Sequence, residues 1–240
     1  MHQSNKARSF WWSLGPSPGN FGDLLTPYIF AHYQIPVVWA DKKKADGLCV
    51  GSVAKFARPG MTIVGTGTMR ASDPLEPRAN WLSVRGPYTR DCVLKSGAYC
   101  PEVYGDPGLL ISKIVPAKQK RYKLGFVPHY VDYAEVVARY PNERVIDILR
   151  ADPLQVAAEI SECETIISSS LHGIIAAHSY NIPCAWVKFS DKLSGDGIKF
   201  LDHYASVGLE CVESKITDPV FSTVLNINTQ SLENVICSLR

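Results

Sequence analysis

Short apolar runs alternate with amphipathic stretches throughout residues 123–187. Apolar runs of this length are typical of buried strands, and the stretches between them are typical of helices. At the second of these helices, Asp152 can cap the first turn, Pro153 suits the first helical position and Gln155 completes a capping-box pattern. The pattern predicts strands at 123–127, 144–148, 165–168 and 183–187, and helices at 132–140, from residue 152, and at 171–180.

The first half of the chain follows a similar pattern. Strands are predicted at 48–53, 61–64 and 81–84, and helices at 23–33 and 87–95. A β-α-β order favours a parallel sheet covered by helices. The polar and basic stretch at 114–122 separates the halves and predicts an N-terminal lobe at 1–116 and a C-terminal lobe at 117–240. We therefore expect an α/β protein with two Rossmann-like lobes facing across a cleft, and ligands beyond the carboxyl ends of the strands.

Composition narrows the classes of partner. The chain has 240 residues, of which 46% are hydrophobic, and 25 Lys and Arg against 23 Asp and Glu give a net charge of +2. So small a charge argues against a nucleic-acid partner. No apolar run approaches a membrane span, and no secretory signal is visible. The seven cysteines form no C-x-x-C pair, which favours buried thiols in a reducing cytoplasm and predicts no metal site.

The strongest motif runs from Ser168 to Gly173, where an apolar strand leads into three serines and then a helix that carries His172. The free N–H groups of a helix start favour an anion, serines add donors, and histidine can act as an acid. The structural alternative is simple capping by serine beside a satisfied histidine. A serine-hydrolase interpretation is disfavoured because Gly-x-Ser-x-Gly is absent.

Other candidates also follow predicted strands or precede predicted helices. Arg85 lies between a strand and the helix that begins at Pro87, where a guanidinium can bind a phosphate or carboxylate or form a structural salt bridge. Asp23 can cap a helix or accept a proton from a sugar hydroxyl. His129, which ends the first strand of the second half, is expected to point toward the cleft. Gly65-Thr66-Gly67 is a glycine-rich strand exit that lets a ligand approach the backbone.

In order and spacing, these motifs resemble those of the polysaccharide pyruvyl transferase family, and most resemble the bacterial ketal-pyruvate transferases of the xanthan and succinoglycan type. The resemblance covers residues from about Trp11 to Gly208. The matching motifs are Asn20-Phe21-Gly22-Asp23, Gly51-Ser52-Val53, Gly65-Thr66-Gly67, Val84-Arg85-Gly86-Pro87, Val103 to Gly108, Pro128-His129, Ser168 to Gly173, and Lys199 with Asp202.

The resemblance implies a GT-B-like fold and transfer of an enolpyruvyl unit from phosphoenolpyruvate to two hydroxyls of a sugar in an exopolysaccharide repeat unit. It implies that Arg85 and His172 bind phosphoenolpyruvate. Many members have arginine before the Leu-His pair, where this chain has Ser170. The family's downstream lysine matches Lys192 by distance from Pro183 and Lys199 by local pattern, and both stay candidates.

These arguments together define a set of predicted site residues. His172, Asp23 and Arg85 are predicted to be catalytic. Phosphoenolpyruvate, a substrate rather than a cofactor, is expected at Arg85, Ser169, Ser170, His172, Lys192, Lys199 and His129. The acceptor is expected at Asn20, Asp23, Gly65, Thr66 and Gly67.

Two other functions fit the same pattern. One is a GT-B-type glycosyltransferase that uses a nucleotide sugar, and the other is a non-catalytic subunit that binds an anion or sugar. The resemblance implies a lipid-linked acceptor at the cytoplasmic face of a membrane. Trp11 and Trp12 could contact that membrane together with the basic stretch at 114–122, although a buried core strand is favoured for the tryptophans.

Overall fold

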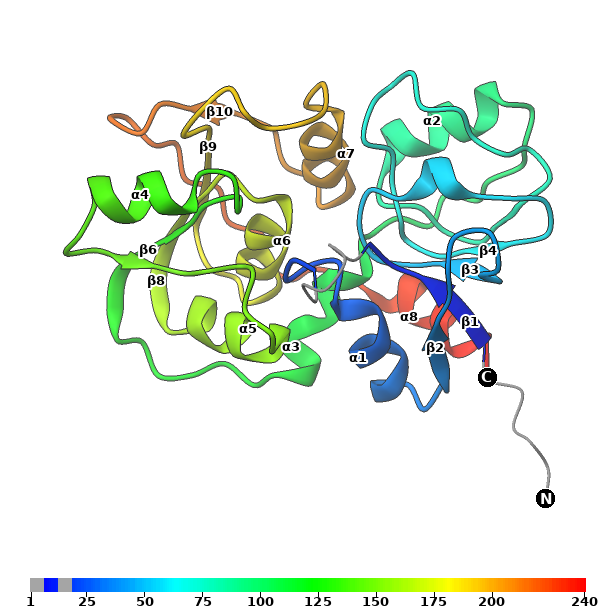
Figure 1. Cartoon of the computed structure of the whole chain (residues 1–240), viewed down its shortest axis with the longest axis horizontal. Coiled ribbons are helices and arrows are strands. Elements are labelled where there is room, and N and C mark those ends of the chain that lie inside the picture. The colour runs from blue at the N-terminus through cyan, green and yellow to red at the C-terminus, as the bar shows by residue number, and fades with distance from the viewer. Residues whose placement is uncertain (1–6, 13–18) are drawn as a thin grey trace.

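Two parallel sheets, one in each half of the chain, organise the structure (Figure 1). The computed structural model describes residues 7–12 and 19–240. In the first half the elements are β1 (Ala7–Phe10), α1 (Leu25–His32), β2 (Val37–Trp39), β3 (Gly47–Leu48), the 3₁₀ turn η1 (Ala54–Phe56), β4 (Thr62–Ile63), β5 (Asn80–Trp81), α2 (Pro87–Lys95), the 3₁₀ turn η2 (Pro107–Leu110) and α3 (Ile111–Ile114).

The second half contains the two longest strands among the described residues, each of six residues. Its elements are β6 (Tyr122–Val127), α4 (Tyr133–Arg139), β7 (Arg144–Val145), α5 (Pro153–Ser161), β8 (Cys163–Ser168), α6 (Leu171–Ser179), β9 (Cys184–Val187), α7 (Ile198–Ser206), β10 (Glu213–Ser214) and α8 (Gln230–Cys237).

Each sheet has five strands, in the orders β2-β1-β3-β4-β5 and β10-β9-β8-β6-β7. Neighbouring strands are parallel in both sheets, with Leu124 opposite Thr165 and Ile167 opposite Ala185 in the second. Parallel strands require crossover connections, and helices supply most of them here. The predicted α/β class with two parallel-sheet lobes is confirmed.

Most predicted elements form, although several strands are shorter than predicted. Asp152 caps α5 through Leu154 N at 2.9 Å, as expected. The capping alternative for Asp23 is wrong, because α1 starts at Leu25 without a side-chain cap. The pattern does not predict β1, β2, η1, η2, α3, α7, β10 or α8. The strands among them have two to four residues, which is too short for a clear alternation of apolar and polar positions.

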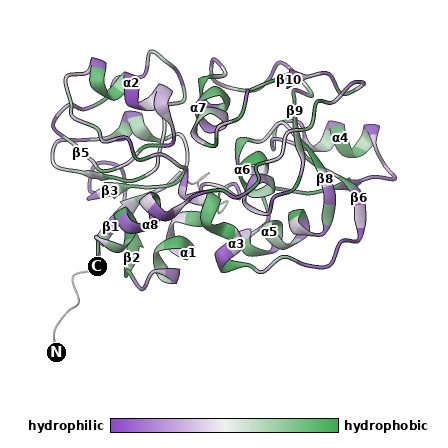
Figure 2. Ribbon diagram, turned by 180° about the vertical axis from the view of Figure 1, so that it is seen from behind, coloured by the Kyte–Doolittle hydropathy of each residue, from purple (hydrophilic) through white to green (hydrophobic). Residues whose placement is uncertain are grey.

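The largest apolar core joins the two lobes rather than filling one of them. It contains Phe21, Ile29, Leu110, Ile160 and Ile174, which come from α1, η2, α5, α6 and the loop before α1. Figure 2 shows the hydrophobic stretches of α1 and α6 between the sheets. Since burying apolar surface is the main favourable contribution to folding, this shared core fixes the lobes against each other.

The last helix returns to the beginning of the chain. Tyr33 Oη donates to Glu233 Oε2 of α8 at 3.0 Å, and Lys113 Nζ pairs with Glu233 Oε1 at 2.6 Å. Figure 1 shows α8 next to α1 and β1. The first sheet ends with β5 and the second begins with β6, whereas α8 at the end of the chain packs near α1 of the first lobe. The division of the chain into two lobes at 116/117 stays a prediction.

All seven cysteines are free thiols. Cys49, Cys100, Cys163 and Cys184 are buried, as predicted, whereas Cys92, Cys211 and Cys237 are only partly buried. Among the helices of the described residues, none combines the length and apolar character that crossing a bilayer requires.

Candidate functional site

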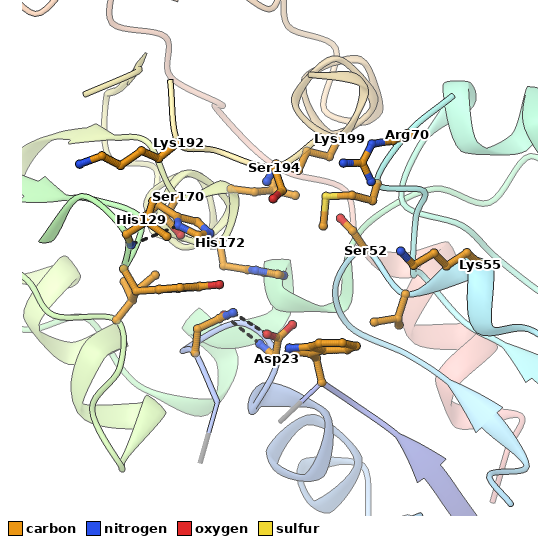
Figure 3. A pocket seen from close by; sticks show the side chains of 18 of the residues that line it. Asp23, Ser52, Lys55, Arg70, His129, Ser170, His172, Lys192, Ser194 and Lys199 are labelled. Atoms are coloured by element: carbon orange, nitrogen blue, oxygen red, sulfur yellow. Dashed lines mark hydrogen bonds between the residues drawn. The ribbon is translucent and has the colours of Figure 1, made fainter. Parts of the chain in front are cut away.

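A cavity of about 330 Å³ opens between the lobes, within the usual range for small-molecule sites. Figure 3 shows Ser52 and Lys55 on the side of the first lobe, His129, Ser170 and Lys192 on the opposite side, and His172 between them. The predicted site residues that line the cavity are Asn20, Asp23, His129, Ser170, His172, Lys192 and Lys199. Side chains distant in the sequence are therefore brought together in one place.

His172 lies in the first turn of α6, and the Ser170 hydroxyl caps this helix through Gly173 N. The imidazole fits against the backbone of Gly22, where a Cβ atom would lie 1.9 Å from the ring. Its Nε2 lies 3.6 Å from Asp106 Oδ2 and has no hydrogen-bond partner among the described residues. A buried imidazole nitrogen without a hydrogen-bond partner is uncommon, so the alternative of a satisfied histidine does not hold.

Asp23 is positioned by the loop that precedes α1. Phe21 N donates to Ile148 O of the second lobe at 2.7 Å, and the Asn20 amide donates to Asp23 Oδ2. Burial raises the pKa of Asp23 to about 6, nearby Asp106 acts in the same direction, and His172 and Lys199 oppose the rise. A carboxylate with a pKa near neutrality can accept or donate a proton, as acid–base chemistry requires.

The two candidate lysines occupy different parts of the cavity. Lys199, in the first turn of α7, is only 6% exposed. Burial lowers its pKa to about 8, with a further contribution from Arg85, while Asp23 opposes the shift. Lys192 lies at the exposed rim, where its Nζ is 3.4 Å from Glu135 Oε2. A buried ammonium is screened much less than an exposed one, which favours Lys199 over Lys192 for the predicted contact with the donor.

His129 reaches the cavity at the end of β6, as expected from its place after the strand. Burial, with a smaller contribution from nearby Lys199, lowers its pKa to about 4, so the imidazole is neutral near pH 7. Ser169 is buried and does not line the cavity. Its hydroxyl accepts from His129 N at 2.8 Å and donates to Asp132 Oδ2 at 3.3 Å, which holds the β6 loop against the start of α6.

The sequence predicts that Arg85 binds phosphoenolpyruvate, but in the structure its guanidinium is part of a buried ion pair. Its side chain has no exposed surface, and it donates to Asp202 Oδ2 at 3.0 Å, Ser52 Oγ at 2.7 Å and Thr68 O at 2.7 Å. Asp202, on α7, also accepts from Thr89 at the start of α2. The alternative of a structural salt bridge therefore describes this arrangement. A direct contact of Arg85 with phosphoenolpyruvate stays a prediction.

The glycine-rich exit at 65–67 shapes the cavity from behind rather than lining it. Thr66 Oγ1 donates to Gly51 O at 2.7 Å and accepts from Val53 N at 3.2 Å. A Cβ atom at Gly67 would lie 2.3 Å from Arg85 Cζ, so glycine leaves room for the buried guanidinium. Contact of these three residues with an acceptor likewise stays a prediction.

The sequence analysis missed several residues of the site. Asp106 accepts from Gly51 N at 3.3 Å and Gly108 N at 2.8 Å and faces His172, although the sequence around it indicates only a turn. Lys55, Arg70 and Trp12 line the cavity from the first lobe. No local pattern distinguishes Lys55 and Arg70 from surface cations. Trp12, expected in a core strand, lies beyond the end of β1 and is partly exposed.

Comparison with known proteins supports the resemblance that the sequence motifs indicate. Residues 75–191 match the model of the polysaccharide pyruvyl transferase family, a segment that contains Arg85, Asp106, His129 and His172. An uncharacterized protein of Acanthamoeba polyphaga mimivirus is 34% identical over 192 residues, which cover 75% of this chain and 66% of the viral protein. The chain thus spans about two thirds of the length of that relative. Residues 75–191 of this protein therefore form a domain of the polysaccharide pyruvyl transferase family.

The substitution Arg85→Met tests the role of the buried ion pair. It leaves the Asp202 carboxylate buried without its cation, so we expect a loss of about 3–5 kcal/mol in the free energy of unfolding, measured with urea. The matched control is Arg8→Met, which removes an exposed pair with Asp46 and should lower the free energy of unfolding far less. Equal losses in the two variants would contradict a structural role for Arg85.

Proposed function

We propose that this protein transfers the enolpyruvyl unit of phosphoenolpyruvate to two hydroxyls of one sugar, forming a pyruvate ketal and releasing phosphate. The observation that carries the proposal is the grouping in one cavity of a buried ammonium, a carboxyl with a pKa of about 6, and an imidazole at a helix start whose Nε2 has no hydrogen-bond partner within residues 7–12 and 19–240. The pyruvyl transferase family domain at residues 75–191 supports the same chemistry.

The charges of the cavity suit this donor. Phosphoenolpyruvate carries a carboxylate and a phosphate, and the cavity offers Lys199, His172 when protonated, and the N–H groups at the start of α6. Helix starts favour anions, and ammonium groups form strong charge-assisted hydrogen bonds with phosphate. Arg70 and Lys55 add positive charge from the first lobe.

The reaction needs two proton transfers and two bond formations. A proton adds to the methylene carbon of phosphoenolpyruvate, and the oxygen of the first sugar hydroxyl bonds to the adjacent carbon. The C–O bond to phosphate breaks, and a second hydroxyl of the same sugar closes the ketal. The two sugar hydroxyls release two protons. One balances the proton that the methylene carbon gains, and the other leaves with the phosphate.

We assign roles to the cavity residues accordingly. Asp23 accepts the proton of a sugar hydroxyl, since it ionises near neutrality. His172 donates a proton or stabilises the leaving phosphate through its imidazole. Lys199 binds the donor. Arg85 donates hydrogen bonds to Ser52 and Asp202. It thereby positions the cavity wall at Ser52 and helix α7 at Asp202. The acceptor is proposed to be part of a polysaccharide repeat unit, lipid-linked and at the cytoplasmic face of a membrane.

Ligand-induced stabilisation and phosphate release test this function together. Phosphoenolpyruvate at about 100 times its Kd should add about 2.7 kcal/mol of stability, and UDP- or GDP-sugars should add none. Phosphate release should require a glycoside with two neighbouring hydroxyls, and His172→Ala should lower kcat/KM about 10²–10⁴-fold. Stabilisation by nucleotide sugars alone would indicate a glycosyltransferase, and donor binding without phosphate release would indicate a binding subunit.

The pH dependence of donor binding tests Lys199. Because its pKa is about 8, the ammonium loses its proton as the pH rises through 8, and the affinity for phosphoenolpyruvate should fall in that range. Lys199→Arg keeps its charge and should bind with a flatter pH dependence above 8, whereas Lys199→Met should bind weakly at every pH. Calorimetric titration measures the Kd. The same pH dependence in wild type and Lys199→Met would exclude Lys199 as the titrating group.

A further inference from the structure

Aromatic rings form part of the first-lobe wall of the cavity. Trp12 stacks on Phe56 with ring centroids 5.9 Å apart and an interplanar angle of 13°. Phe10 meets both rings edge-on, at 6.4 Å from Trp12 and 5.4 Å from Phe56. Trp12 and Phe56 line the cavity, while Phe10 is buried beneath them. Because Phe10 and Phe56 pack against the indole, Trp12 is held in a fixed orientation.

Trp12 keeps a large open surface in this arrangement. It is 41% exposed, although one face of the indole is occupied by Phe56. The donor-binding groups described above do not use this surface. A large aromatic ring that is supported from behind and open toward a cavity is suited to binding an apolar face of a ligand.

The position of Trp12 relates it to the proposed base. The carbonyl of Trp12 lies next to Gly19, where a Cβ atom would be 3.0 Å away. Gly19 begins the loop in which Asn20 Oδ1 accepts from Gly22 N at 3.1 Å and the Asn20 amide donates to Asp23. The aromatic wall and the Asn20–Asp23 pair are therefore held by neighbouring backbone. Both line the same cavity.

We propose that Trp12 and Phe56 form the acceptor subsite, where a pyranose ring stacks on Trp12 with its hydroxyl edge toward Asn20, Asp23 and Lys55. A pyranose has an apolar face of C–H bonds and a rim of hydroxyls, which matches an aromatic ring bordered by a carboxylate, an amide and an ammonium. Lys55 Nζ lies 5.3 Å from the Phe56 centroid, at the border of this surface. The assignment of the sugar as acceptor rests on the proposed function.

The test uses Trp12→Ala, Trp12→Phe and, as a control, Tyr99→Ala. Tyr99 is 81% exposed and lies outside the cavity, so its loss removes an exposed aromatic ring without affecting the site. Binding is read first without phosphoenolpyruvate, by saturation-transfer NMR with methyl β-glucopyranoside, methyl β-galactopyranoside and methyl α-mannopyranoside. We expect at least one of these glycosides to receive saturation on its C–H protons from the wild type and from Tyr99→Ala, and none from Trp12→Ala.

Kinetics supply the second measurement. With a glycoside that supports phosphate release, Trp12→Ala should raise the acceptor KM about tenfold, with the Kd of phosphoenolpyruvate unchanged. Trp12→Phe should recover most of this loss, because it restores an aromatic face. An unchanged Kd for phosphoenolpyruvate in Trp12→Ala also shows that the cavity still folds.

The outcomes separate this inference from the proposed function. Trp12-dependent glycoside binding without phosphate release would keep the subsite and overturn the transferase proposal. Phosphate release with an unchanged acceptor KM in Trp12→Ala would keep the transferase and overturn the subsite. Saturation of UMP instead of any glycoside, Trp12-dependent binding to anionic vesicles alone, or no glycoside binding by the wild type would each overturn the subsite.

Discussion

The buried ion pair between Arg85 and Asp202 fixes the part of the structure on which the site depends. Arg85 follows the first sheet, and Asp202 belongs to α7 in the second lobe, 117 residues later. Asp202 also accepts from the backbone and hydroxyl of Thr89 on α2, at 2.9 and 2.6 Å. Since an unpaired buried charge is strongly destabilising, these bonds hold α7 against the first lobe. Lys199 lies one turn earlier on the same helix, so the hydrogen bonds of Asp202 also position the Lys199 ammonium in the cavity.

The pKa values of the cavity residues depend on this contact between α7 and the first lobe. Asp23 and Lys199 are buried by elements from opposite lobes, and burial moves their pKa values toward neutrality, to about 6 and about 8. Desolvation disfavours the charged form of each group, and their mutual attraction offsets only part of that effect. His172 lies against Gly22, in the same loop that carries Asp23. Asp23 and Lys199, whose pKa values lie near neutrality, are thus buried in one cavity, a common arrangement for acid–base chemistry.

Sequence reasoning predicts the local features well and the long-range partnerships poorly. The serine-rich start of α6, the Pro153 helix start and the placement of His129 follow from patterns within a few residues. The burial of Arg85 does not follow from such local patterns, because its partner Asp202 is distant in the chain. A guanidinium after a strand fits either a ligand-binding or a structural role. Asp106 reads as a turn residue because its contact with Gly51 depends on the fold. Trp12 reads as core because its exposure depends on the cavity beside it.

The central claim is that a cavity between two lobes holds a small polyanionic donor on Lys199, His172 and the start of α6. A crystal structure of the protein with phosphoenolpyruvate tests this most directly. The account predicts that the phosphate or carboxylate lies within hydrogen-bond distance of Lys199 Nζ, His172 Nε2 and the N–H groups at the start of α6, with the methylene carbon open toward Asp23. Phosphoenolpyruvate bound outside this cavity, or within it without contact to Lys199 and His172, would contradict the account.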